Sequence, residues 1–165
     1  MKKLYLIRHA KSSWLEEGVD DFDRPLKGSG IRDAHNTSQW MEQQGFTPDL
    51  IVSSPATRAL HTALIFAKNL HYPYGDIKLK EAIYEAEVKD LFKTIRKLKD
   101  KYNSVFLFGH NPTITTFVNH CIDHIIDNVP TTGVACLKFD VEYWTDLETE
   151  AELLFFDFPK RRIKK

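Results

Sequence analysis

Short apolar runs alternate along this chain with stretches whose apolar residues recur at helical spacing. Buried strands are predicted at residues 3–7, 49–52, 105–108, 134–139 and 153–158, and a further short run at 77–79 is a candidate. Helices are predicted at residues 29–44, 53–70, 88–101 and 113–123. This alternation predicts an α/β fold, a three-layer sandwich with a central, largely parallel mixed sheet flanked by helices.

The composition fits one ordinary folded domain. The chain has 165 residues, of which 42% are hydrophobic and 28% are charged, so an intrinsically disordered chain is excluded. Lys and Arg number 23, as do Asp and Glu, which argues against a dedicated nucleic-acid partner. We therefore expect a single domain over residues 1–158 and a basic, solvated C-terminal tail over residues 159–165.

No targeting or membrane-spanning segment is expected. A helix that crosses a bilayer needs roughly 18 consecutive apolar residues, whereas the N-terminal apolar run stops after four, at Arg8 and His9. Cys121 and Cys136 lack the C-x-x-C spacing of a zinc site or redox pair. These features predict a cytoplasmic protein with reduced cysteines and no membrane partner.

One pair of histidines has the spacing of a helical zinc site. His120 and His124 are four residues apart, but no glutamate occupies the H-E-x-x-H position and the sequence suggests no third ligand. A helix face or helix end is therefore favoured over a metal site. The sequence also lacks a Walker loop and an aspartate metal box, so we expect neither a metal nor another cofactor.

Reactive side chains follow three of the predicted strands directly. Arg8 and His9 come after the first, Arg58 lies in the first helical turn after the second, and His110 follows the strand at 105–108. The carboxyl ends of parallel strands meet at one edge of a sheet, where ligands bind. Guanidinium groups bind phosphate oxygens, and neutral imidazole is a competent nucleophile whose pKa neighbouring arginines should lower. The four residues therefore predict a site for a dianionic phosphoryl group.

The motifs around these residues resemble a known family. They are LIRHAKS at residues 6–12, SSPATRA at 53–59, GHNP at 109–112, and RPL at 24–26 followed by Gly28 and Gly30. In this order the chain resembles the histidine phosphatase superfamily, and within it the short SixA-type phosphohistidine phosphatases. The resemblance extends from residue 4 to about residue 139. Ala10 replaces the glycine of the commoner R-H-G motif.

The resemblance implies a phosphoglycerate-mutase-like fold and a role for each matching residue. His9 corresponds to the histidine that accepts the phosphoryl group, and Arg8 and Arg58 correspond to the arginines that bind its oxygens. His110 corresponds to the second histidine, which hydrogen-bonds the transferring group. Arg24 belongs to the matching R-P-L-x-x-x-G segment and is expected to contact substrate.

The sequence leaves open which residue is the general acid and whether several other residues contact the substrate. LKEAIY at residues 79–84 resembles the family's L-x-E-x-x-Y pattern and nominates Glu81, with Glu85 as the second choice and a solvated loop residue as the plain alternative. Lys11 and Ser12 are candidates for substrate contact, although Lys11 also fits a surface charge. Pocket and purely structural roles fit equally well for three further sites, namely Trp14, His61 and Thr132-Gly133.

Together these observations predict a metal-independent phosphatase. The expected substrate is phosphohistidine on a protein, hydrolysed through a phosphohistidine enzyme intermediate with inorganic phosphate as product. One alternative is a small-molecule phosphomonoesterase acting on sugar or nucleotide phosphates. Another is a module that binds phosphorylated partners without turnover, although binding alone would not require the nucleophile His9.

Overall fold

The computed structural model describes residues 1–15 and 17–163. Its strands are β1 (Lys2–Arg8), β2 (Leu50–Ser53), β3 (Lys78–Leu79), β4 (Ser104–Gly109), β5 (Val134–Phe139) and β6 (Glu152–Asp157). Its α-helices are α1 (Gly28–Gln43), α2 (Thr57–Asn69), α3 (Val88–Arg96), α4 (Thr113–Cys121) and α5 (Pro159–Ile163). Short 3-10 turns are η1 (Asp21–Asp23), η2 (Tyr74–Asp76), η3 (Glu81–Ile83) and η4 (Trp144–Asp146). Within these described residues, every helix is too short or too polar to cross a bilayer.

The strands form one mixed sheet in the order β3-β2-β4-β1-β5-β6. The first four strands in this order run parallel, whereas β5 is antiparallel to both β1 and β6. The last two strands are therefore antiparallel neighbours. The predicted α/β architecture with a largely parallel mixed sheet is confirmed.

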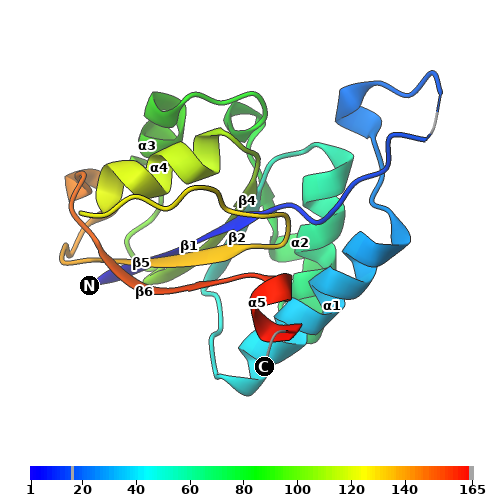
Figure 1. The fold of residues 1–165 in the computed structure, drawn as a ribbon. Coiled ribbons are helices and arrows are strands. Elements are labelled where there is room, and N and C mark those ends of the chain that lie inside the picture. Colours follow the sequence, from blue (N-terminus) through cyan, green and yellow to red (C-terminus); the bar gives the residue numbers. More distant parts are fainter. Residues whose placement is uncertain (16, 164–165) are drawn as a thin grey trace.

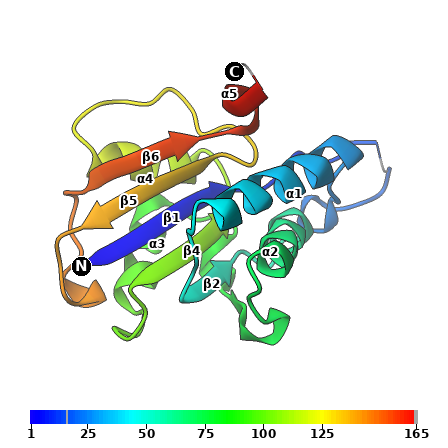
Figure 2. The same cartoon turned by 90° about the horizontal axis from the view of Figure 1, so that it is seen from below.

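Helices cover both faces of the sheet and complete the three layers. Helices α1 and α2 lie on one face, with α5 beside α1, and α3 and α4 lie on the other (Figures 1 and 2). Strand β1 alternates between the two cores, since Leu4 and Leu6 pack under α3 and α4 while Tyr5 and Ile7 pack under α1 and α2. A strand buried on both faces reads as a continuous apolar run, which is why the sequence marks β1 so clearly.

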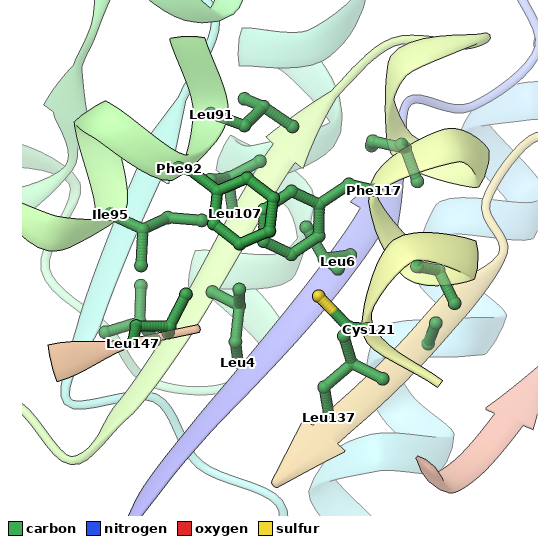
Figure 3. Close-up of a cluster of buried hydrophobic side chains, with 14 of the residues drawn as sticks. Leu4, Leu6, Leu91, Phe92, Ile95, Leu107, Phe117, Cys121, Leu137 and Leu147 are labelled. Atoms are coloured by element: carbon green, nitrogen blue, oxygen red, sulfur yellow. The ribbon is translucent and has the colours of Figure 1, made fainter. Parts of the chain in front are cut away.

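The core beneath α3 and α4 is mostly aliphatic and contains one close pair of phenylalanines. Phe92 of α3 and Phe117 of α4 pack with ring centroids 4.4 Å apart above Leu6 and Leu107 of the sheet (Figure 3). All four side chains are buried. Truncating one such phenylalanine to alanine typically costs about 3–5 kcal/mol of folding free energy. This core fixes β1 and β4 side by side.

Two helices end earlier than their apolar spacing predicts. Helix α3 stops at Arg96 rather than residue 101, and beyond its end the Asp100 carboxylate accepts a hydrogen bond from the Trp144 backbone at 2.7 Å. Helix α4 stops at Cys121 rather than residue 123, and the Cys121 carbonyl accepts a bond from the Ala151 N–H at 2.8 Å. In both cases the chain near the helix end bonds to a residue distant in sequence.

The basic C-terminal segment is more ordered than the predicted solvated tail. Residues 159–163 form α5, and Arg162 pairs with Asp157 and also donates to the Thr37 hydroxyl of α1. Asp157 is buried, with only 2% of its surface exposed. Arg162 therefore attaches this segment to the domain, while Lys160 and Arg161 are exposed as expected. Residues 164–165 lie outside the described residues.

Candidate active site

The carboxyl ends of three neighbouring strands meet at one point of the sheet. Strand β4 lies between β1 and β2, with Arg8 paired to Gly109 and Ser53 paired to Phe108. The residues that follow these strands therefore leave the sheet side by side. Helix α2 begins at Thr57 rather than at residues 53–55, so Pro55 precedes the helix and Arg58 still falls in its first turn.

A cavity of about 300 Å³ opens where these segments converge. Its lining comprises Arg8, His9, Lys11, Ser12, Trp14, Arg24, Arg58, His110, Asn111 and Thr131. The structure thus brings together Arg8, His9, Arg58, His110, Lys11, Ser12 and Arg24, but not the candidate acids Glu81 and Glu85. It also adds Asn111 of the GHNP motif and Thr131, to which the sequence assigned no role.

Three buried arginine donors around this cavity have no partner. The Nε–H groups of Arg8, Arg24 and Arg58 are buried and unpaired in the described part of the chain. A buried polar group without a partner costs about 1–3 kcal/mol, and buried donors are rarely left unpaired. The three arginines that line this cavity nevertheless supply fixed positive charge suited to a phosphoryl group or a similar anion.

Arg8 is held in place by the loop that precedes β5. Its Nη1 donates to the Val129 carbonyl at 3.1 Å. The backbone N–H of Thr132 in turn donates to the carbonyls of Arg8 and His9, at 3.1 and 3.2 Å. Thr132 therefore joins this loop to the end of β1, while its neighbour Thr131 lines the cavity.

The geometry of His9 leaves one ring nitrogen free to attack. The ring is buried, and its Nδ1 lies 2.7 Å from the carbonyl oxygen of Ala10. A carbonyl can only accept a hydrogen bond, so Nδ1 carries the hydrogen, and the Nε2 lone pair has no hydrogen-bond partner among residues 1–15 and 17–163. Burial lowers the pKa of His9 to about 3, and the positive charges of Arg58 and Arg8 add smaller contributions in the same direction. The expected lowering is present, but burial rather than the arginines is its main cause.

His110 faces the same cavity from the end of β4. Its ring centroid lies 5.2 Å from that of His9, and its Nε2 is 2.8 Å from the hydroxyl oxygen of Ser54. Burial lowers the pKa of His110 to about 4, with Arg58 contributing next. When the Ser54 hydroxyl donates to Nε2, the buried and unpaired Nδ1 carries a hydrogen. His110 is then uncharged, and its Nδ1–H is a donor without a partner in the described residues.

The segment between β1 and α1 carries Arg24 into the cavity. Arg24 donates to the Ser12 hydroxyl, and its guanidinium carbon lies 3.6 Å from the centre of the Trp14 ring. Gly30 allows this segment to pack closely, since a Cβ atom there would lie 2.3 Å from the Lys11 carbonyl oxygen. A larger residue would therefore push the segment away from α1.

The structure places Glu81 away from the cavity. Glu81 lies in η3, is exposed, and borders a separate hollow beside Thr94 of α3 and Lys97, which follows α3. Turn η3 directs Ile83 into the core, so Glu81 falls on the opposite side of the turn. The tyrosine of the same sequence pattern does approach the site, with the Tyr84 ring 5.7 Å from that of His110.

The alternative acid Glu85 is exposed and does not line the cavity either. Among the described lining residues there is no aspartate or glutamate. His61, left open by the sequence, is likewise absent from this lining. The cavity is therefore rich in hydrogen-bond donors and poor in carboxylic acids.

The i, i+4 histidine pair does not share one helix. His120 lies in α4 and its Nδ1 is 2.9 Å from the Thr116 carbonyl, whereas His124 lies beyond the helix end and pairs with Asp123. Within residues 1–15 and 17–163, three or more histidine, cysteine or acidic side chains do not gather in a way that could hold a metal ion.

Comparison with known proteins identifies the family. A family model described as the histidine phosphatase superfamily (branch 1) matches residues 4–92. The chain belongs to this superfamily. An uncharacterised protein from Mycobacterium tuberculosis is 28% identical over 165 residues, and this match covers 93% of the chain and 100% of that relative.

Solved structures place the chain near the SixA proteins. The crystal structure of SixA from Agrobacterium tumefaciens, a candidate phosphohistidine phosphatase, is 28% identical with a TM-score of 0.82 and covers 96% of this chain and 98% of that one. A protein histidine phosphatase SixA complexed with tungstate shares the fold at 17% identity and a TM-score of 0.83, covering 97% and 99% of the two chains. As a superfamily member with this fold, the protein is a phosphatase.

Proposed function

We propose that this phosphatase hydrolyses phosphohistidine carried by another protein, through a phosphohistidine intermediate on His9. In the first step the His9 Nε2 lone pair attacks phosphorus, and the N–P bond to the substrate imidazole breaks. The other nitrogen of the substrate ring, whose pKa is about 6.5, takes a proton from solvent before the bond breaks, so the ring leaves as neutral imidazole. In the second step water attacks the phosphorus, the bond to His9 breaks, the proton passes to solvent, and inorganic phosphate leaves.

The remaining cavity residues would stabilise the transferring group. The guanidinium groups of Arg8, Arg24 and Arg58, which line the cavity, would bind its oxygens, and His110 would supply a neutral donor. Such preorganised donors act where negative charge is concentrated, and removing one typically costs about 2.7–4 kcal/mol of transition-state stabilisation. In this mechanism the arginines carry the charge that a metal ion would otherwise supply, so no metal is required.

The lack of a carboxylic acid in the described cavity lining carries the substrate assignment. An alkoxide leaving from a phosphate ester needs a proton donor, which typically contributes about 10²–10⁴-fold to the rate. A phosphohistidine ring can take a proton from solvent at its other nitrogen, with a pKa of about 6.5, and then leaves as neutral imidazole without a positioned acid. A donor-rich cavity with no acid among its described lining residues therefore suits an N–P bond better than an ester bond.

The rim of the cavity favours a substrate attached to a protein. Trp14 lines the cavity yet is 78% exposed, and the adjacent Leu15 is 86% exposed. Exposed apolar side chains at the mouth of a site can contact a macromolecular surface. The similarity to SixA proteins named for phosphohistidine or protein histidine phosphatase function agrees with this choice. The cytoplasmic location stays a prediction from the sequence.

A direct comparison of substrates tests the proposal. The protein is assayed, with and without a chelator, on a phosphohistidine peptide, the matched phosphoserine peptide, a sugar phosphate and a nucleotide. We expect kcat/KM to be at least about 100-fold higher for the phosphohistidine peptide than for the esters, with no effect of the chelator. Preference for a small ester would instead support a phosphomonoesterase, and binding without turnover would support a phospho-binding module.

A further inference from the structure

Asp21 of η1 contacts two of the three cavity arginines. Arg58 donates through Nη2 to the Asp21 carboxylate at 3.1 Å and through Nη1 to the Asp21 carbonyl at 2.7 Å. Arg24 donates through Nη2 to the other carboxylate oxygen at 3.2 Å. The Tyr84 hydroxyl donates to the same carboxylate at 2.8 Å. We call Asp21 with these three partners the Asp21 cluster.

The Asp21 carboxylate is charged under working conditions. Burial raises its pKa, but the hydrogen bond from Tyr84 and the charge of Arg58 outweigh that effect and lower the pKa to about 2. The side chain is 48% exposed, so the negative charge is accessible to solvent as well as to the arginines. A fixed anion therefore sits against the cavity, although it does not line it.

Each of the two arginines is shared between Asp21 and the cavity. A guanidinium has five N–H donors, and Asp21 uses the terminal nitrogens of Arg58 and one terminal nitrogen of Arg24. The Nε–H groups of both arginines stay buried and unpaired. Both guanidinium groups also line the cavity, so a phosphoryl group bound there would lie on the same pair of cations as Asp21.

We propose that Asp21 is a built-in competing anion, which weakens the binding of inorganic phosphate in the cavity and so favours release of the product. Like charges that share a cation oppose each other, and three arginines without a counter-charge would retain a dianion tightly. Slow product release limits the turnover of many enzymes. This inference rests on the proposed function only in that the cavity binds a phosphoryl group.

The neighbouring acid Asp20 provides a matched control. Asp20 directly precedes η1 and is exposed. In the described residues its carboxylate accepts no hydrogen bond from Arg8, Arg24 or Arg58, whose side chains bond elsewhere. Asp20→Asn and Asp21→Asn thus remove the same charge one residue apart, but only the second removes it from the arginines.

Calorimetric titration of the full chain with inorganic phosphate, at low ionic strength, tests the inference. We expect Asp21→Asn to lower the Kd for phosphate by about tenfold, and Asp20→Asn to leave it within about twofold of the unmodified protein. Asp21→Ser is a second neutral variant with the same expected direction, and thermal unfolding without ligand checks that each variant is folded. Tyr84→Phe keeps the carboxylate and should leave the Kd within about twofold.

Three results would overturn the inference. Unchanged or weaker phosphate binding by both neutral Asp21 variants would mean that Asp21 orients the arginines rather than competing for them. An equal gain in Asp20→Asn would assign the effect to net charge. Failure of the unmodified protein to bind phosphate would also remove the basis of the proposed function, whereas binding that Asp21→Asn does not tighten would leave that function intact.

Discussion

At the scale of single residues, the environment of each histidine determines what it can do. The Ala10 carbonyl fixes a hydrogen on His9 Nδ1, and burial keeps the ring neutral. The sequence predicted the two histidines because they directly follow strands. It did not predict the partner Ser54, because the contact between Ser54 and His110 spans 56 residues and depends on how two loops meet. Local sequence patterns carry no signal for such a contact.

The low pKa of His9 predicts how stability depends on pH. An unfolded chain binds a proton at this histidine near pH 6.5, whereas the folded protein holds the pKa of His9 at about 3. The contribution to stability is therefore complete above about pH 6.5 and declines as the pH falls, by about 1.4 kcal/mol per unit. We expect the melting temperature to fall between pH 7 and pH 5, and to fall less in His9→Asn.

Thermal unfolding of His9→Asn and of His120→Asn checks this prediction. His120 is exposed on α4, so its substitution should leave the pH dependence of the unmodified protein in place. The same pH dependence in all three proteins would show that His9 is not the buried, neutral group described here.

At the scale of elements, the sequence predicts where strands lie better than where helices end. Strands β1 and β4 are buried on both faces, so their apolar runs mark them within one or two residues. Near the ends of α3 and α4, Asp100 bonds to Trp144 and Cys121 bonds to Ala151. The sequence does not reveal these two contacts. Turn η3 is a third element whose structure the sequence did not predict. The spacing of residues 79–84 matched the pattern that nominated Glu81, but the burial of Ile83 turns Glu81 away from the cavity.

The segment that carries Arg24 depends on close packing at the start of α1, which Gly30→Ala should disrupt. The new Cβ would lie 2.3 Å from the Lys11 carbonyl oxygen, so the segment must shift. We expect kcat/KM to fall at least about tenfold, since a displacement of about 1 Å at a positioned group can cost 10²-fold. Gly28→Ala is the control, because its nearest neighbour would be Arg32 Nη1 at 3.7 Å. Similar activity in the two variants would contradict this account.

At the scale of the whole molecule, the N-terminal strand β1 and the C-terminal helix α5 are held in the fold by different interactions. The N-terminal strand β1 is central, between β4 and β5, and its position follows from its apolar sequence. The C-terminal helix α5 is attached through Arg162, which pairs with buried Asp157 and reaches α1. The sequence predicted a solvated tail because the segment is basic. Composition does not show which basic residue pairs with a buried carboxylate.

Loss of the Arg162 contact should destabilise the folded domain. Arg162→Ala leaves the Asp157 carboxylate, whose side chain is 3% exposed, with Arg161 at 3.6 Å as its remaining cationic partner. Breaking a buried ion pair typically costs about 3–5 kcal/mol, and we expect about 3 kcal/mol in urea denaturation. Lys160→Ala is the control, since Lys160 is exposed. Equal stability of the two variants would mean that α5 contributes little to folding.

The covalent intermediate is the central claim, and rapid quenching tests it most directly. The protein is mixed with a radiolabelled phosphohistidine peptide, quenched in base within one turnover, and mapped by proteolysis. We predict a base-stable, acid-labile phosphoryl group on His9, absent from His9→Ala, and formed more slowly but on the same residue in His110→Ala. Label on any other residue, or turnover by His9→Ala at the rate of the unmodified protein, would contradict the mechanism.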